Sequence, residues 1–241
     1  MSLAAVDVGV GRARPPGQAA EGVEITARAY RVCCRVMRPG HKTVALTAVA
    51  GGVLLGFLDF LWIKWVPYPF AELGNSTATW AVAAFLFGYW FRSGWRRTAV
   101  AAAALLVVAV PSYYLAATLV QGDELSVAWA PSSLLWMLFG VLAGVVFGIG
   151  GNWARATGWR QIVGTALPAA VFFEEAARFV RRTRDPGYPP GTAWNVVIDV
   201  ALGVLVVALV GGSNRRRALA LAAALPLAGI VFVGFAAVTG H

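Results

Sequence analysis

The sequence predicts an all-α membrane protein, built as a bundle of about seven transmembrane helices. Of its 241 residues, 59% are hydrophobic and only 13% are charged, whereas soluble domains carry about 25% charged residues. The mean hydropathy is +0.69. The charges gather in short clusters between long apolar runs, and a helix needs about 20 such residues to cross a bilayer core of about 30 Å.

Each apolar run after residue 42 defines one expected span. Neighbouring helices are expected to be antiparallel because the connections are short. The fifth run differs from the others because it ends in Glu174, Glu175 and Arg178. Residues 1–42 form an expected cytoplasmic segment, partly disordered or lying as a helix on the membrane surface, and residues 43–241 form the membrane domain. The expected spans are 43–63, 76–92, 98–120, 127–148, 161–179, 193–212 and 218–240.

Glycines recur at short spacing in two of the runs. Small residues let transmembrane helices approach closely, so we expect helix contacts there. The positions are Gly51, Gly52 and Gly56 in the first run and Gly140, Gly144 and Gly148 in the fourth. The distribution of basic residues predicts the orientation, because fifteen of the 20 Lys and Arg lie on the N-terminal side of the expected topology. The positive-inside rule places that side in the cytoplasm, with the protein in the plasma membrane.

Four acids lie within or at the ends of the expected spans, where an ionisable residue is a functional candidate by default. At 1.5 Å per residue, Asp59 lies about 6 Å from the exit end of the first span, and Asp199 lies about 9 Å from the entry end of the sixth. Glu174 and Glu175 end the fifth span. Because the sixth span runs opposite to the first and fifth, all four acids are expected at one depth, in the outer leaflet. They are the candidate catalytic residues.

Other interpretations of these acids remain open. Glu174 or Glu175 can pair with Arg178, which lies four or three residues further along one helix face. We expect only one of them to pair well, leaving the other free. Either glutamate can also be a solvated helix end, and Asp59 and Asp199 can belong to a proton relay or an ion site.

Aromatic residues crowd the same level of the expected bundle. Many of them are expected to be interfacial anchors. Aromatic faces also attract cations, at about 0.5–2 kcal/mol each. A pocket with carboxylic acids on one wall and aromatic faces on the others therefore suits a carbocation. The candidate substrate-binding residues are Trp62, Trp80, Phe85, Tyr113, Trp136, Phe173 and Trp194.

The sequence also lacks several functional signatures. It has no phosphate loop, nucleotide fingerprint or histidine cluster, and no HExxH or paired-cysteine metal signature; these are the patterns that hold nucleotides or metals. No cofactor and no metal are therefore expected. Most arginines lie where helix-end anchors would lie, so no nucleic-acid partner is expected either.

These residues predict a protonation-initiated cyclisation. A carboxylic acid in a low-dielectric site keeps its proton at neutral pH, and it can then protonate an alkene or an epoxide. Aromatic faces would hold the resulting carbocation while rings close and water is excluded. A second carboxylate can orient the first or take back the final proton.

Three segments carry a resemblance to the small integral-membrane terpene cyclases: GFLDFLWIKW around Asp59, NSTATWAVAAF around Asn75 and Trp80, and FFEEAARF around Glu174 and Glu175. The chain is most similar to the actinobacterial cyclases of drimentine-type indole sesquiterpenoid pathways, which belong to secondary metabolism. It is also similar to small actinobacterial membrane proteins of unknown function. The first resemblance implies an isomerase that cyclises a farnesyl chain on an indole diketopiperazine. It implies Asp59 and one glutamate as the acid pair, and a prenyltransferase of the same pathway as a candidate partner.

Two other functions use the same acids. A small proton-coupled transporter would use them as a relay, although no clear internal repeat of the kind that transporters often show is visible. A non-catalytic membrane or assembly protein would use them as structural groups. Conversion of a linear prenyl substrate to a ringed product of unchanged mass separates the cyclase from both.

Overall fold

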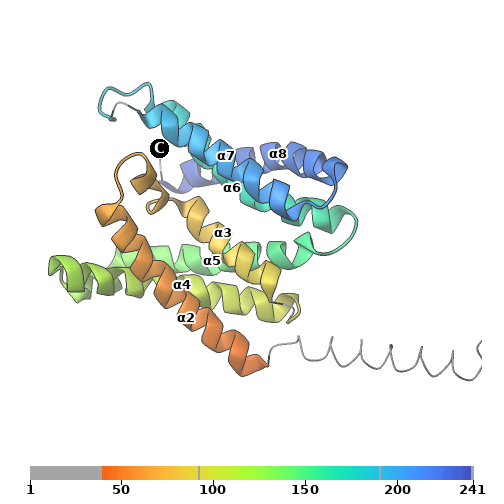
Figure 1. Cartoon of the computed structure of the whole chain (residues 1–241). Coiled ribbons are helices and arrows are strands. Elements are labelled where there is room, and N and C mark those ends of the chain that lie inside the picture. The colour runs from red at the N-terminus through yellow and green to blue at the C-terminus, as the bar shows by residue number, and fades with distance from the viewer. Residues whose placement is uncertain (1–39, 92, 190, 240–241) are drawn as a thin grey trace, which may run out of the picture. The chain divides into compact units, whose positions relative to one another are not determined.

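The computed structural model describes residues 40–91, 93–189 and 191–239. Within them the protein has seven α-helices and two short 3₁₀ helices, and it has no strand (Figure 1). The predicted all-α bundle is therefore confirmed, whereas nearly all of the predicted N-terminal segment lies outside the described residues. The elements are α2 (His41–Trp65), η1 (Phe70–Leu73), α3 (Thr77–Trp90), α4 (Trp95–Gln121), η2 (Leu125–Trp129), α5 (Pro131–Ala154), α6 (Trp159–Arg182), α7 (Thr192–Val210) and α8 (Asn214–Thr239).

Local sequence explains where the helices begin. Ser76 is the N-cap of α3, and its side chain accepts a hydrogen bond from the backbone N–H of Thr79 at 3.1 Å, which satisfies one of the unpaired donors of a helix start. The fourth expected span began at residue 127, but η2 occupies residues 125–129 and α5 begins at Pro131. Proline has no N–H to donate and its fixed φ suits the first helical position.

Five of the described helices are long and apolar enough to cross a membrane: α2, α4, α5, α7 and α8. The other two differ for separate reasons. α3 has 14 residues, which is about 21 Å and shorter than a bilayer core. α6 has 24 residues but carries Glu174, Glu175 and Arg178 near its end.

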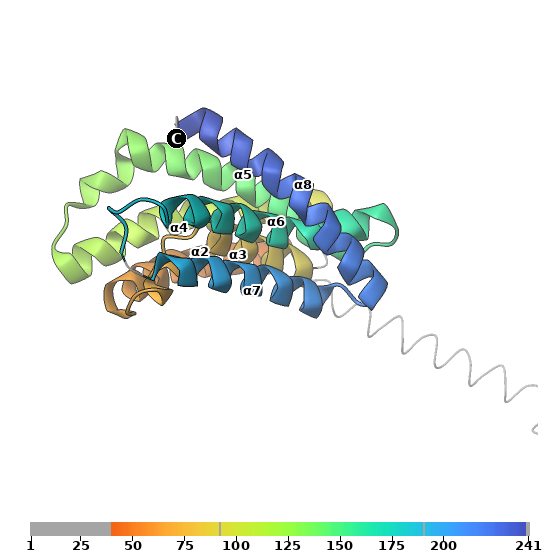
Figure 2. The same ribbon diagram turned by 90° about the horizontal axis from the view of Figure 1, so that it is seen from above.

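α3 and α6 are also the helices that lie inside the bundle. α3 packs against α4, α5 and α6, and α6 packs against α3, α5, α7 and α8. Figure 2 shows α6 with α5, α7 and α8 around it. A helix enclosed by other helices does not have to match the lipid in length or polarity. The charged residues that made the fifth span atypical therefore face protein.

Glycines set the closest helix contacts, as the sequence predicted. A Cβ on Gly52 or Gly56 of α2 would overlap the backbone carbonyls of Leu105 or Ala109 of α4. On α5, a Cβ on Gly144 would meet the backbone of Ala103, and one on Gly148 would meet Ala102. Hence α4 is held tightly between α2 and α5, and this trio forms three sides of the site described below.

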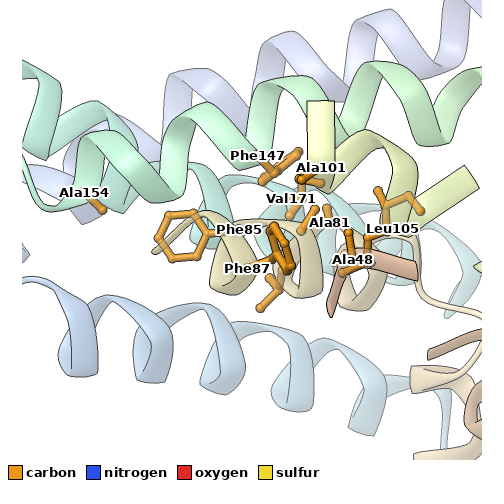
Figure 3. Close-up of a cluster of buried hydrophobic side chains, with 14 of the residues drawn as sticks. Ala48, Ala81, Phe85, Phe87, Ala101, Leu105, Phe147, Ala154 and Val171 are labelled. Carbon is orange, nitrogen blue, oxygen red and sulfur yellow. The ribbon is translucent and has the colours of Figure 1, made fainter. Parts of the chain in front are cut away.

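The main hydrophobic core links α2 to α6. Figure 3 shows Phe85 and Phe87 of α3, Phe147 of α5 and Val171 of α6 in one cluster. A second, alanine-rich cluster lies between α6, α7 and α8 and contains Ala166, Ala169, Ala170, Val207, Ala220 and Ala224. Small side chains at these positions bring α7 and α8 close to α6.

The α2–α4 contact gives the first testable prediction. Gly56→Ala places a methyl group 2.9 Å from the backbone nitrogen of Tyr113 and closer still to the Ala109 carbonyl, so α2 must move. We expect a loss of about 1–3 kcal/mol, seen as a lower Tm of the purified protein in detergent. Gly229→Ala in α8 is the matched control, because its Cβ would have no atom within 4 Å. Equal Tm values for the two variants would contradict the contact.

Candidate functional site

The four acids predicted from the sequence lie around the beginning of α3. Asp59 lies near the end of α2, Glu174 and Glu175 near the end of α6, and Asp199 in the second turn of α7. All four are buried, with exposed fractions of 8%, 2%, 5% and 2% in that order. Asp59 reaches Trp80 of α3, and Glu175 reaches the first residues of the same helix.

A cavity of about 290 Å³ opens beside Asp59, between α2, α3, α4 and α5. Its walls are mainly apolar and aromatic, and Asp59 is the only charged residue among the described residues that line it. Five aromatic rings face this space, from three of the four helices. The lining residues are Asp59, Gly74, Asn75, Ser76, Thr77, Trp80, Ala81, Leu106, Val110, Tyr113, Tyr114, Trp136, Phe139, Gly140 and Ala143.

One hydrogen bond holds Asp59 against the cavity wall. The indole Nε1–H of Trp80 donates to Oδ2 of Asp59 at 3.1 Å. Indole nitrogen can only donate, so this contact fixes one carboxyl oxygen and leaves the other, Oδ1, without this constraint. Next to it the Tyr113 ring packs edge-on against Phe60 of α2 at 5.3 Å between centroids.

Glu175 binds the N-terminal turn of α3 from behind the cavity wall. It accepts hydrogen bonds from the backbone N–H groups of Thr77 at 3.2 Å and Ala78 at 3.4 Å, and from the Ser76 hydroxyl. The unpaired N–H groups and the positive end of the helix dipole both favour a carboxylate at this place. Ser76 and Thr77 line the cavity. Glu175 therefore touches two lining residues without lining the cavity itself.

Arg178 pairs with both glutamates, which corrects the expectation that only one could pair well. Its Nε lies 2.8 Å from Oε1 of Glu174, and its Nη2 lies 3.1 Å from Oε1 of Glu175. A guanidinium offers five N–H donors in one plane, and residues three and four positions earlier share its helix face. Neither glutamate is left free. Arg178 also donates to the Thr77 hydroxyl at 3.3 Å, which ties α6 to α3.

Asp199 joins this buried cluster from α7. The buried face of α7 repeats every three or four residues and includes Asn195, Asp199 and Gly203. Asp199 is close enough to Glu175, Arg178 and Glu174 for electrostatic interaction, and its Oδ2 has no hydrogen-bond partner among the described residues. It does not line the cavity. The four acids therefore do not share one pocket wall, as the sequence had suggested: Asp59 lines the cavity, whereas Glu174, Glu175 and Asp199 form a cluster behind its wall.

Three of the seven predicted substrate-binding aromatics line the cavity: Trp80, Tyr113 and Trp136. The other four lie elsewhere for reasons that the structure shows. Trp62 is exposed and donates to the Phe70 carbonyl at 2.8 Å, and Trp194 is exposed on α7. Phe85 is fully buried in the main core, and Phe173 packs on Gly203.

Several cavity residues were not predicted from the sequence, although their spacing along α4 and α5 carries a signal for them. On α5, Trp136, Phe139, Gly140 and Ala143 lie on one helix face, as residues three, four and seven positions apart do. Leu106, Val110 and Tyr113 repeat this pattern on α4. The remaining lining residues are Gly74, Asn75, Ser76, Thr77, Ala81 and Tyr114. Among the described residues, no group of three or more His, Cys, Asp or Glu side chains could hold a metal ion.

Comparison with known proteins places the chain in a family. Residues 37–241 match the family described as "Family of unknown function (DUF6518)". Because the match covers most of the sequence, the protein belongs to this family. No curated protein and no solved structure matches the chain, so the function has to be argued from the residues and their geometry.

The unequal surroundings of the two glutamates give a testable prediction. Each substitution removes an ion pair with Arg178. Glu175→Gln also weakens the hydrogen bonds that Glu175 accepts from the start of α3, which Glu174 does not make. Breaking a buried ion pair costs about 3–5 kcal/mol. We therefore expect Glu175→Gln to lower the Tm in detergent more than Glu174→Gln does. The reverse order would mean that Glu174, not Glu175, holds α3.

Proposed function

We propose that this family member is a metal-independent terpene cyclase of the bacterial plasma membrane, with its N-terminus in the cytoplasm. Its substrate would be a linear farnesyl-type chain, and the first step would be proton transfer from Asp59. One observation carries the proposal: Asp59 is the single charged group among the described residues that line a cavity whose walls are mainly apolar and aromatic. In such surroundings Asp59 has few proton acceptors other than a bound substrate.

The chemical step follows from the geometry of Asp59. Trp80 occupies Oδ2, so we assign the transferred proton to Oδ1. That proton moves to one carbon of an alkene, or to an epoxide oxygen, and leaves a carbocation and the Asp59 carboxylate. The π electrons of the next double bond attack the cation, which forms a carbon–carbon bond and moves the charge along the chain. Positioned acids contribute about 10²–10⁴-fold to such steps.

The aromatic walls suit the charge that moves along the chain. Tyr113 and Tyr114 of α4 and Trp136 and Phe139 of α5 face the same cavity as Asp59. Each ring face can contribute about 0.5–2 kcal/mol toward a cation. The lining contains no lysine or arginine among the described residues that would repel the cation. Exclusion of water by these side chains would protect it from hydration until the rings have closed.

The volume of the cavity limits what reacts inside it. At about 290 Å³ the cavity lies at the lower end of the range for ligand pockets, about 300–1,000 Å³. It therefore suits a prenyl segment rather than a prenyl chain together with a ring-containing acceptor. We propose that the chain reacts inside while the acceptor stays at the opening, beside the exposed Asn75.

The cluster behind the wall suits the last step, loss of a proton. The Ser76 hydroxyl lines the cavity and donates to Glu175. The final cation can release a C–H proton to the oxygen of Ser76 while the hydroxyl proton of Ser76 passes to Glu175. Glu174, Arg178 and Asp199 have no direct contact with the cavity. In this mechanism they hold Glu175 in place.

Asp59→Asn tests the proposal directly. Membranes that contain the protein are incubated with a farnesylated indole diketopiperazine and with other linear polyprenyl acceptors, and products are analysed by mass spectrometry and NMR. We expect the wild type to give a product of unchanged mass with fewer double bonds, and Asp59→Asn to lower its rate at least about 100-fold.

Asp185→Asn, in the exposed α6–α7 connection, is the matched control and should keep full activity. Equal turnover in both variants would remove Asp59 from the mechanism. Uptake of a labelled solute into vesicles, without chemical change, would identify a carrier instead. If neither product formation nor solute uptake is observed, a structural role would be favoured.

Ser76→Ala tests the route of the final proton. If Ser76 passes that proton to Glu175, its loss removes the relay, while the backbone N–H groups of Thr77 and Ala78 still bind Glu175 and hold α3 in place. Cyclisation then continues, but the last cation persists longer. We expect a new product with the mass of one added water, detected by mass spectrometry. Ser112→Ala is the control, because that hydroxyl is buried in α4 and donates to the Val53 carbonyl at 2.7 Å, away from the cavity. An unchanged product mixture from Ser76→Ala would exclude the relay.

A further inference from the structure

The two ends of the helix bundle differ in charge. At one end lie the starts of α2, α4, α6 and α8, and we call it the arginine end. Its described residues carry basic side chains and no acid, and it lies toward the right of Figure 1. The basic residues are Lys42, Arg96, Arg97, Arg155, Arg160, Arg215, Arg216 and Arg217. The described acids lie in the opposite half: Asp59, Glu72, Asp123, Glu124, Glu174, Glu175, Asp185 and Asp199.

A Gly–Trp–Arg sequence occurs twice at this end, where α4 and α6 begin. Trp95 and Trp159 are 51% and 61% exposed although both are large and apolar. An arginine stacks on each ring: the guanidinium carbon of Arg96 lies 5.1 Å from the Trp95 centroid, and that of Arg160 lies 5.7 Å from the Trp159 centroid. Each pair thus combines an exposed indole with a cation.

Arg155 joins the two loops that carry these pairs. Its Nη2 donates to the carbonyl of Phe91, in the α3–α4 connection, at 3.4 Å, and its guanidinium lies over the Tyr89 ring at 5.5 Å. The α5–α6 connection therefore lies against the α3–α4 connection. The two Trp–Arg pairs therefore lie at the same end of the bundle, on helices whose preceding connections are in contact.

We propose that this surface, formed by Trp95, Arg96, Arg97, Trp159 and Arg160, binds the headgroups of anionic phospholipids. Charge complementarity selects the partner, because no described acid at this end neutralises the arginines. The location selects lipid rather than another polyanion, because the arginines adjoin helices that are apolar enough to cross a bilayer. Tryptophan is enriched at headgroup level, and basic clusters near a bilayer attract anionic lipid. This inference is independent of the proposed cyclase activity.

The test uses the purified full-length chain in mixed micelles of detergent and lipid. Equal amounts of phosphatidylglycerol and phosphatidylcholine are added, and the lipids retained by the protein are counted by native mass spectrometry. We expect the wild type to prefer phosphatidylglycerol. In the triple variant Arg96→Gln, Arg97→Gln, Arg160→Gln the preference should fall at least about tenfold, because each basic residue near an anionic surface contributes roughly fivefold.

Two further variants make the result specific. Lys64→Gln, Arg181→Gln, Arg184→Gln removes three charges from the opposite end and should keep the preference. Arg96→Lys, Arg97→Lys, Arg160→Lys keeps the charge and should also keep it, which separates charge loss from misfolding. Equal losses in the two glutamine variants, or no preference in the wild type, would overturn the proposal. So would tight binding of a DNA duplex by the wild type without any preference for phosphatidylglycerol, since nucleic acid would then be the partner.

Discussion

The interaction on which the site depends is the binding of Glu175 and Arg178 of α6 to the first turn of α3. A carboxylate and a guanidinium are costly to bury unless their hydrogen bonds are made inside the protein. The start of α3 supplies those bonds through two backbone N–H groups and the hydroxyls of Ser76 and Thr77. These contacts fix the position of α3, and α3 carries Trp80 toward Asp59. The position of the Asp59 carboxyl group in the cavity thus depends on the contact of Glu175 and Arg178 with α3, which lies behind the cavity wall.

The same constraint explains why α6 lacks the composition of an ordinary span. A helix that carries an ion cluster has to be surrounded by protein, because lipid offers no hydrogen bonds. α5, α7 and α8 pack on α6, and all three are apolar and long enough to cross a membrane. Tight packing through Gly52, Gly56 and Gly144 then lets α2, α4 and α5 close the remaining sides. α6 can carry charged residues because its apolar neighbours separate it from the lipid.

Sequence reasoning succeeded where one residue type has one strong physical preference. Long apolar runs predicted seven helices, closely spaced glycines predicted their contacts, and acids in apolar runs predicted the buried carboxyl groups. The sequence did not predict features that depend on which helices pack against each other. Whether Phe85 or Phe139 faces the cavity depends on the rotation of α3 and α5, and both residues suit a core or a pocket equally well. The double pairing of Arg178 was missed because the Thr77 contact that orients it comes from a segment 101 residues away.

Acidic and basic residues are distributed unevenly along the bundle, and this distribution relates the proposed lipid-binding surface to the cavity. The described acids all lie in the half that contains the cavity, and the exposed Trp–Arg pairs lie at the opposite end. Moving charge across a low-dielectric layer is costly, so a surface bound to anionic headgroups would keep the bundle at a fixed depth. A fixed depth would in turn keep the cavity at a level of the bilayer where a hydrophobic prenyl chain could enter it laterally from the lipid. The proposed lipid binding at the arginine end and the proposed reaction in the cavity would therefore need no direct contact, because the helices hold the two regions at a fixed separation.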